Sequence, residues 1–128
     1  TMPTTTKVDL VLVAYSGVDP VDPLAQWAVR QETATTTAHM SPPLSSPAVG
    51  GWVVSYWAEK TSTTTDWLPP SGQVSRTETS GSGSGRIESL LVDSGGEVGA
   101  GQWSALTATA DTAGRKVIAF SVSLRPAP

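Results

Sequence analysis

Residues 51–59, Gly-Trp-Val-Val-Ser-Tyr-Trp-Ala-Glu (GWVVSYWAE), give the clearest indication of the fold. Successive side chains in a β-strand point to opposite faces, which puts Trp52 and Tyr56 on one face and Val53 and Trp57 on the other. The stretch is rich in β-branched and aromatic residues, which suit a pleated, half-buried surface. It therefore predicts a strand, and at least one of its two tryptophans should belong to the core.

Other strand-like segments lie on both sides of this stretch, separated by Gly, Pro, Ser and Asp. The segment 7–15 (KVDLVLVAY) is apolar on both faces and predicts a central strand, whereas the polar segments 33–40 and 73–80 are typical of sheet edges. The run 81–85 (GSGSG) predicts a hairpin tip. The remaining segments are 86–93, 104–110 and 116–124, turns are expected at 94–101 and 111–114, and 24–32 is either a short strand or a single helical turn.

Seven or eight short strands without an amphipathic helix predict an all-β fold. We expect a single antiparallel β-sandwich of jelly-roll or immunoglobulin-like type. The chain has 128 residues, enough for one domain, with residues 1–6 as a flexible lead-in and residues 7–128 as the sandwich. It contains no cysteine, so the immunoglobulin disulfide is excluded.

Composition argues against two classes of partner. The net charge is −3 and the 8 Lys and Arg residues are scattered, so no basic stripe exists to contact nucleic acid. The longest apolar run, 11–15, is far shorter than the roughly 20 residues of a membrane-spanning helix, so we expect no membrane insertion. The absence of Asn and the scarcity of Ile, Phe and Lys indicate a genome rich in G and C.

The candidates for catalysis are few. His39 is the only histidine and has no acidic neighbour in sequence, so we expect an ordinary surface or strand residue. Glu59 and Glu88, each on an expected strand, are the carboxylate pair that a glycosidase would need, although solvated carboxylates at strand edges are commoner. There is no Gly-x-Ser-x-Gly motif. We therefore expect a protein that is not an enzyme.

Two acidic residues, Asp19 and Asp22, lie in the proline-rich loop 19–23 (DPVDP). Loop carboxylates of this kind bind Ca²⁺ in β-sandwich modules, but Asp also stabilises turns by bonding its own backbone. Both interpretations stay open, and no other cofactor is expected.

Tryptophan dominates the aromatic residues, with 5 Trp against 2 Tyr and 1 Phe. An indole presents a flat face that stacks on a sugar ring, while the alternative use is core packing. Trp67 and Trp103 lie in or beside loops rich in Pro and Gly, so we predict that they are exposed ligand contacts, together with Tyr56.

Several phrases of the sequence carry a resemblance to a known group of proteins. They are AYSGVDP (14–20), WLPPSG (67–72), GSG (83–85) leading into LLVD (90–93), and TATA (107–110) before FSV (120–122). With these phrases the chain resembles poorly characterised β-sandwich modules of secreted or cell-surface actinobacterial proteins and of virion proteins of their phages. The resemblance implies a non-enzymatic module that acts in attachment, decoration or assembly.

These observations lead to one main hypothesis and one alternative. The first is an extracytoplasmic, non-catalytic adhesion module that recognises a surface glycan through exposed tryptophans. The alternative is a structural or decoration domain of a phage capsid or tail, acting in assembly or host attachment, which predicts oligomers or particles. The expected location is extracellular, at the cell surface or in the virion, and the partner is a glycan or a protein surface.

Overall fold

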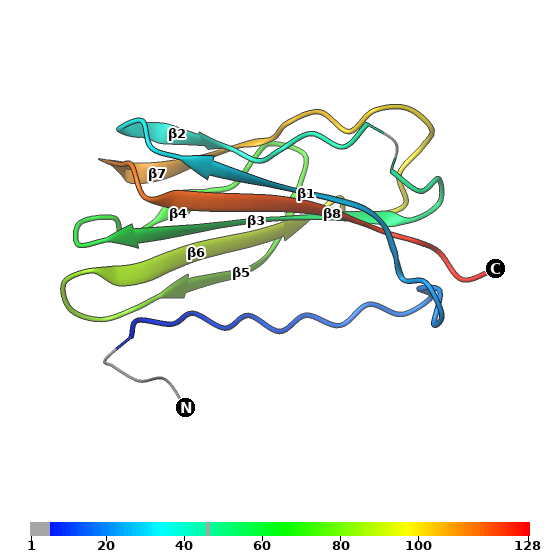
Figure 1. The fold of residues 1–128 in the computed structure, drawn as a ribbon, viewed down its shortest axis with the longest axis horizontal. Helices are drawn as coiled ribbons and strands as arrows, with labels where there is room; N and C mark the ends of the chain where they lie inside the picture. The colour runs from blue at the N-terminus through cyan, green and yellow to red at the C-terminus, as the bar shows by residue number, and fades with distance from the viewer. Residues whose placement is uncertain (1–5, 46) are drawn as a thin grey trace.

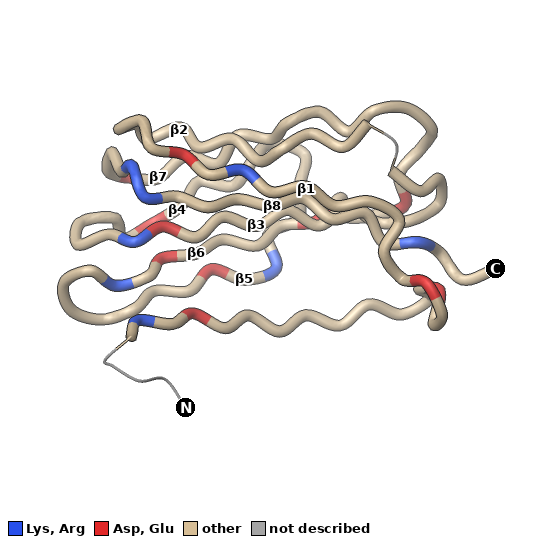
Figure 2. Tube along the Cα trace, viewed as in Figure 1, with Lys and Arg blue, Asp and Glu red and all other residues tan. Residues whose placement is uncertain are grey.

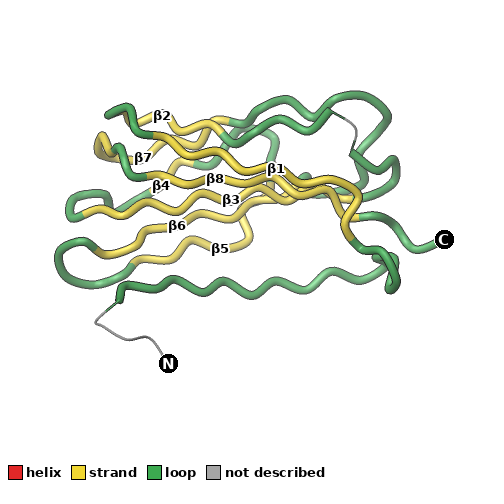
Figure 3. Tube along the Cα trace, viewed as in Figure 1, coloured by secondary structure: helices red, strands yellow, loops and turns green. Residues whose placement is uncertain are grey.

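The computed structural model describes residues 6–45 and 47–128, and the chain is all-β within these ranges (Figures 1 and 3). Apart from Thr6, the expected lead-in 1–6 lies outside the described residues. No helix in this part of the chain has the length and apolar character needed to cross a membrane. The strands are β1 (Leu24–Glu32), β2 (Thr36–Met40), β3 (Trp52–Thr61), β4 (Trp67–Leu68), β5 (Val74–Ser80), β6 (Arg86–Asp93), β7 (Thr107–Gly114) and β8 (Val117–Leu124).

The strands form two packed antiparallel sheets, which confirms the predicted sandwich. The five-stranded sheet has the order β1-β8-β3-β6-β5, and the three-stranded sheet has the order β2-β7-β4. The pairs β1·β8, β2·β7 and β3·β6 are nested, as in the folded-over hairpin of a jelly roll. β5 departs from this nesting, because it pairs with β6 in a hairpin and not with β4.

The core follows from the alternation predicted for residues 51–59. Trp57 is fully buried and joins the main cluster between the sheets, whereas Trp52 lies on the opposite face of β3. Leu90 and Val117, on neighbouring strands, complete this layer. A smaller apolar cluster around Leu44 and Val53 closes the end of the sandwich where β3 begins.

Most of the expected segments are strands, and the open choice at 24–32 is resolved as strand β1. Among the differences, the loop expected around Trp67 contains the short strand β4, and β7 continues through the expected turn at 111–114. The last difference has a packing reason. A Cβ atom on Gly114 would lie 1.4 Å from a carboxylate oxygen of Glu59, so the strand passes this point only because the residue is glycine.

The predicted central strand at 7–15 is wrong. These residues are extended, but they pair with no strand in the described chain and run lengthwise beside β5 and β6 (Figures 1 and 3). We call residues 7–16 the strap. Its Asp9 carboxylate accepts hydrogen bonds from the hydroxyls of Tyr56, Thr79 and Ser89, which all lie on the face of the large sheet opposite the core.

Alternation along the strap explains why the sequence was misleading. Val11, Val13 and Tyr15 face the sheet and are half-buried, whereas Leu10 and Leu12 face solvent and are 88% and 93% exposed. A segment with apolar residues on both faces is suited to burial between two layers, but the pattern does not show that a second layer is present. Figure 2 shows that the strap's charged residues lie near its start, so the rest presents only uncharged groups.

Candidate functional site

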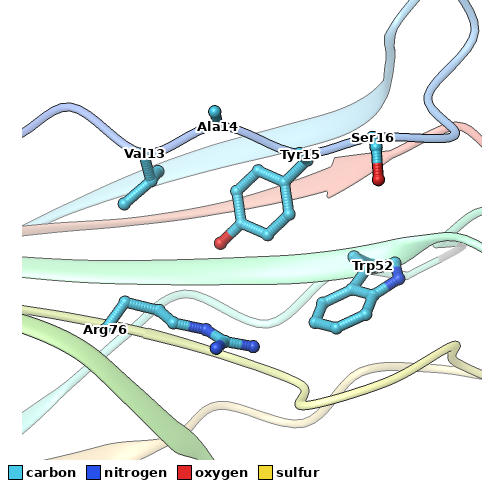
Figure 4. Close-up of a pocket in the computed structure, with 6 residues that line it drawn as sticks. All are labelled: Val13, Ala14, Tyr15, Ser16, Trp52 and Arg76. Carbon is cyan, nitrogen blue, oxygen red and sulfur yellow. The ribbon is translucent and has the colours of Figure 1, made fainter.

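The end of the strap and the outer face of the large sheet enclose a cavity of about 390 Å³ (Figure 4). It lies at the end of the sandwich where β3 begins. Its lining comes from three segments distant in sequence: Val13, Ala14, Tyr15 and Ser16 of the strap, Trp52 of β3 and Arg76 of β5.

Two aromatic rings form one wall of this cavity. The ring centroids of Tyr15 and Trp52 are 5.8 Å apart, and the planes are tilted by 53°. Both residues are half-buried, so each ring keeps a part of its surface open. No hydrogen bond within the described residues uses the indole N–H of Trp52, which leaves it free for a ligand. In Figure 4 the hydroxyl of Ser16 points toward the same indole.

Arg76, which lines the cavity, lies at a β-bulge in β5. Ser75 pairs with Val92 and Thr77 pairs with Leu91, so Arg76 is an extra residue with no partner in the register. A bulge re-aims the side chain of the extra residue and is frequent beside functional sites. The Arg76 guanidinium lies on the outer face, 5.7 Å from the centre of the Trp52 ring.

Asp93, at the end of β6, fixes the arginine. Its carboxylate is fully buried and accepts bonds from Arg76 Nε (2.5 Å) and Nη2 (3.1 Å), and from the Tyr15 hydroxyl (2.9 Å). The backbone N–H of Gly95 donates a further bond of 2.9 Å. Gly95 has a φ of +67°, and a Cβ there would lie 2.7 Å from a Val74 methyl group, so this turn requires glycine.

The electrostatics of the cluster keep each group in its ordinary charge state at neutral pH. Burial acts to raise the pKa of Asp93, but its hydrogen bonds and the positive charge of Arg76 outweigh burial, so the pKa lies below 3.8. Burial, followed by the bond to Asp93, raises the pKa of Tyr15 well above its usual range. Asp93 is therefore an ionised anchor, and Tyr15 stays a protonated donor.

Trp52 and Ser16 also line a second cavity of about 330 Å³, with residues from 50–51 and 124–127. A third cavity, of about 430 Å³, contains Trp103 together with Gln26 and Gln102. Trp103 is half-buried and forms an isolated bridge with Leu44, and its buried indole N–H has no partner in the described chain. That Trp103 contacts a ligand stays a prediction, now with a cavity beside it.

The prediction that Trp67 is exposed is wrong. Its side chain is 2% exposed, belongs to the main core cluster and packs edge-on against His39, with the ring centroids 5.5 Å apart. The neighbouring prolines indicate a loop, but the two residues of β4 pair with β7. Alternation then turns Trp67 inward and Leu68 outward.

Tyr56 contacts the strap and lines none of the cavities found around the described residues. Its ring stacks on Phe120 at a centroid distance of 5.1 Å, and its hydroxyl donates a 2.7 Å bond to Asp9. Burial and the Asp9 carboxylate raise the pKa of Tyr56 to about 12. Tyr56 therefore anchors the strap, and its hydroxyl is already used in this contact.

Glu59 and Glu88 are direct neighbours in register, but they lie between the sheets and are 1% and 0% exposed. Glu59 accepts a hydrogen bond from Thr64, and Glu88 accepts hydrogen bonds from Ser80 and Arg86. The cavities around the described residues reach neither carboxylate. The pair is thus buried and does not lie at a solvated strand edge.

His39 is fully buried, so it is a strand residue without surface exposure. Its Nδ1 donates to a Glu32 carboxylate oxygen at 2.8 Å, and its Nε2 has no partner in the described chain. His39 therefore belongs to the interior between the sheets, away from the three cavities described above.

The proposed calcium ligands Asp19 and Asp22 already have partners. Asp19 accepts bonds from the backbone N–H groups of Val21 (2.8 Å) and Asp22 (3.1 Å), which lower its pKa. Asp22 forms a 2.9 Å ion pair with Arg125. Among the described residues, no three His, Cys, Asp or Glu side chains lie together in a group that could hold a metal ion. Calcium binding at this loop remains a prediction.

Sequence reasoning missed Tyr15, Arg76 and Asp93 as site residues. For Trp52 a signal existed, because it had to lie on the face of the strand opposite Trp57. For Arg76 no comparable signal exists, because a bulge is defined only against the partner strand. Comparisons with protein-family models, curated proteins and solved structures found no match.

Proposed function

We propose that this chain is a non-catalytic binding module that recognises a sugar in the cavity between Tyr15, Trp52 and Arg76. We propose further that it acts outside the cytoplasm, in attachment to a surface. The observation that carries the proposal is a half-buried indole with a fixed arginine beside it in one cavity. The apolar C–H face of a sugar ring stacks on an indole, and its hydroxyl oxygens accept hydrogen bonds from guanidinium and indole N–H groups.

The lining of the cavity favours binding over reaction. It contains one charged residue, Arg76, whose partner Asp93 is buried behind it and already accepts four hydrogen bonds. Hydrolysis of a glycosidic bond needs two carboxyl groups on opposite sides of that bond. Glu59 and Glu88, the pair suggested by the sequence, are sealed between the sheets.

Titration calorimetry against a panel of oligosaccharides tests this proposal with a matched pair of variants. Trp52→Ala should weaken binding about two- to tenfold or more, because stacking on an aromatic ring contributes about 0.5–1.5 kcal/mol beyond the area it buries. Trp27→Ala is the control, since Trp27 lies on β1 of the same sheet, is 65% exposed and lines none of the cavities. Equal binding by Trp52→Ala and the wild type would overturn the proposed site.

A second candidate function is assembly, as a structural or decoration domain of a virion or cell surface. It is favoured by large apolar side chains that are 49–93% exposed: Leu10 and Leu12 on the strap, Trp27 and Val29 on β1, and Ile118 on β8. Large exposed apolar side chains of this kind occur on surfaces that pack against neighbouring chains.

Sedimentation velocity at rising protein concentration distinguishes this second function. Assembly predicts a defined oligomer, and Leu10→Ser with Leu12→Ser should dissociate it because both side chains face solvent in the single chain. The matched control is Val13→Ser, which lies on the inner side of the strap. A monomer at the highest concentration would count against self-assembly.

A further inference from the structure

We propose that the sugar bound in the cavity carries a carboxylate group, as a uronic acid does, and that this carboxylate binds the unoccupied edge of the Arg76 guanidinium. This inference rests on the proposed function, because it names the class of sugar that the same site takes.

Arg76 has hydrogen-bond donors that Asp93 does not use. A guanidinium has five N–H groups arranged as forks that match a carboxylate. Asp93 occupies one edge, through Nε and Nη2. No hydrogen bond in the described chain uses Nη1, so the edge formed by Nη1 and the second N–H of Nη2 is open. The Arg76 side chain is 39% exposed and lines the cavity.

The Arg76 guanidinium is held in place before a ligand arrives. The bonds to Asp93 fix one edge, and the Trp52 ring lies 5.7 Å below the guanidinium carbon. Fixing a long side chain in advance removes the entropy loss that otherwise weakens binding. The bulge at Arg76 interrupts the pairing of β5 with β6 beside the cavity, and bulges are frequent next to functional sites.

The other polar groups of the cavity lining also suit a bound carboxylate. Asp93 is fully buried, and its oxygens are occupied by Arg76, Tyr15 and Gly95, so no free carboxylate faces the cavity lining. The remaining polar groups of the wall include the Trp52 indole N–H, which only donates, and the Ser16 hydroxyl. A wall rich in donors is complementary to a ligand rich in acceptors.

The size of the cavity fits a ligand of this class. Its volume of about 390 Å³ is at the lower end of the range of about 300–1,000 Å³ for small-molecule sites. In this arrangement the ring of the sugar stacks on Trp52 while its carboxylate reaches Arg76, because the two side chains are already in contact.

The experiment compares binding of an acidic sugar with binding of its uncharged methyl ester. Titration calorimetry at pH 7 and low salt measures the affinity for trigalacturonate and for its fully methyl-esterified form. The wild type should bind the acid about tenfold more tightly or better, since hydrogen bonds to charged groups are worth roughly twice those between neutral groups. This preference should shrink as salt is added.

Variants assign the preference to Arg76. Arg76→Gln should abolish it, and Arg115→Gln is the control, because Arg115 is exposed in the turn after β7 and lines no part of this cavity. Since Arg76→Gln leaves Asp93 buried without its counter-charge, the double variant Arg76→Gln with Asp93→Asn provides a folded alternative. It should bind both sugars with the affinity of the ester.

Each outcome is decisive. Equal affinities of the wild type for acid and ester would overturn the carboxylate inference while leaving the sugar-binding function in place. A preference that survives in the double variant would overturn the role of Arg76. Binding of neither sugar, together with silence across the wider oligosaccharide panel, would overturn the proposed function and this inference with it.

Discussion

Glu59 of β3 and Glu88 of β6 lie directly opposite each other, with both carboxyl groups enclosed between the two sheets. Each has its own polar partners: Thr64 donates to Glu59, while Arg86 and Ser80 donate to Glu88. Arg86 also donates to the backbone carbonyl groups of Ser62 and Thr64, so it ties the loop after β3 to β6. This polar cluster is an internal support of the fold.

We predict that Arg86→Met destabilises the protein strongly. Glu88 would stay buried without its counter-charge, and breaking a buried ion pair in this way costs about 3–5 kcal/mol. Urea denaturation measures the loss. Arg115→Met, on an exposed arginine, is the control and should change stability by less than about 0.5 kcal/mol. A loss below about 1 kcal/mol for Arg86→Met would contradict the prediction.

Gly114→Ala should also destabilise the fold, because the new methyl group would occupy the position of the Glu59 carboxylate. Overpacking of a filled interior costs about 1–3 kcal/mol. Gly96→Ala is the matched control, since a Cβ at Gly96 meets no atom within 4 Å. Thermal unfolding of the two variants compares them, and equal melting temperatures would show that Glu59 can move aside.

Asp9→Ala should release the strap while leaving the sandwich folded. The Asp9 carboxylate holds the strap through the hydroxyls of Tyr56, Thr79 and Ser89, and the strap backbone forms no ladder with a strand of the described chain. Chymotrypsin should then cut near Leu10 and Leu12 much faster than in the wild type. The control is Lys7→Ala, which removes only an exposed bond to Ser82. Unchanged cleavage would show that apolar contacts suffice to hold the strap.

Stability should fall in acid because of Asp9 and Asp93. In each case burial acts to raise the pKa, but hydrogen bonds outweigh it, so the folded pKa lies below 3.8. The unfolded state therefore binds more protons near pH 4, and the stability contributed by the charged carboxylates is lost as the pH falls through the folded pKa values. Denaturation between pH 2 and pH 6 should show this slope. Asp93→Asn should flatten it, and an unchanged slope would contradict the assignment.

Local sequence patterns were sufficient for much of the fold. Alternation in residues 51–59 correctly put Trp52 and Trp57 on opposite faces with at least one of them in the core, and the structure shows that Trp57 is the core residue. The glycine run 81–85 is the tip of the β5–β6 hairpin, and the polar segment that became β5 is a sheet edge. These features depend on neighbours within a few residues, which a sequence displays directly.

The candidate site was not predictable in the same way. The prolines and glycine after Trp67 correctly indicated a break in regular structure, but they did not show which way the Trp67 side chain points. That direction is determined by the pairing of β4 with β7. Trp103 did prove to lie beside a cavity, and Tyr56 proved to be an anchor of the strap. No pattern within residues 73–80 shows that Arg76 is an extra residue, because a bulge is defined only against the partner strand.

The sequence by itself thus determined an all-β, antiparallel sandwich, most of its strands and the opposite orientation of Trp52 and Trp57, because the alternation of apolar residues and the turn chemistry act over short distances. Only the tertiary structure decided which apolar faces are covered and which side chains meet. The strap contact between Asp9 and Ser89 spans 80 residues, and the contact between Tyr15 and Asp93 spans 78. Such contacts follow from sheet order and strand register, which arise when distant segments pack together.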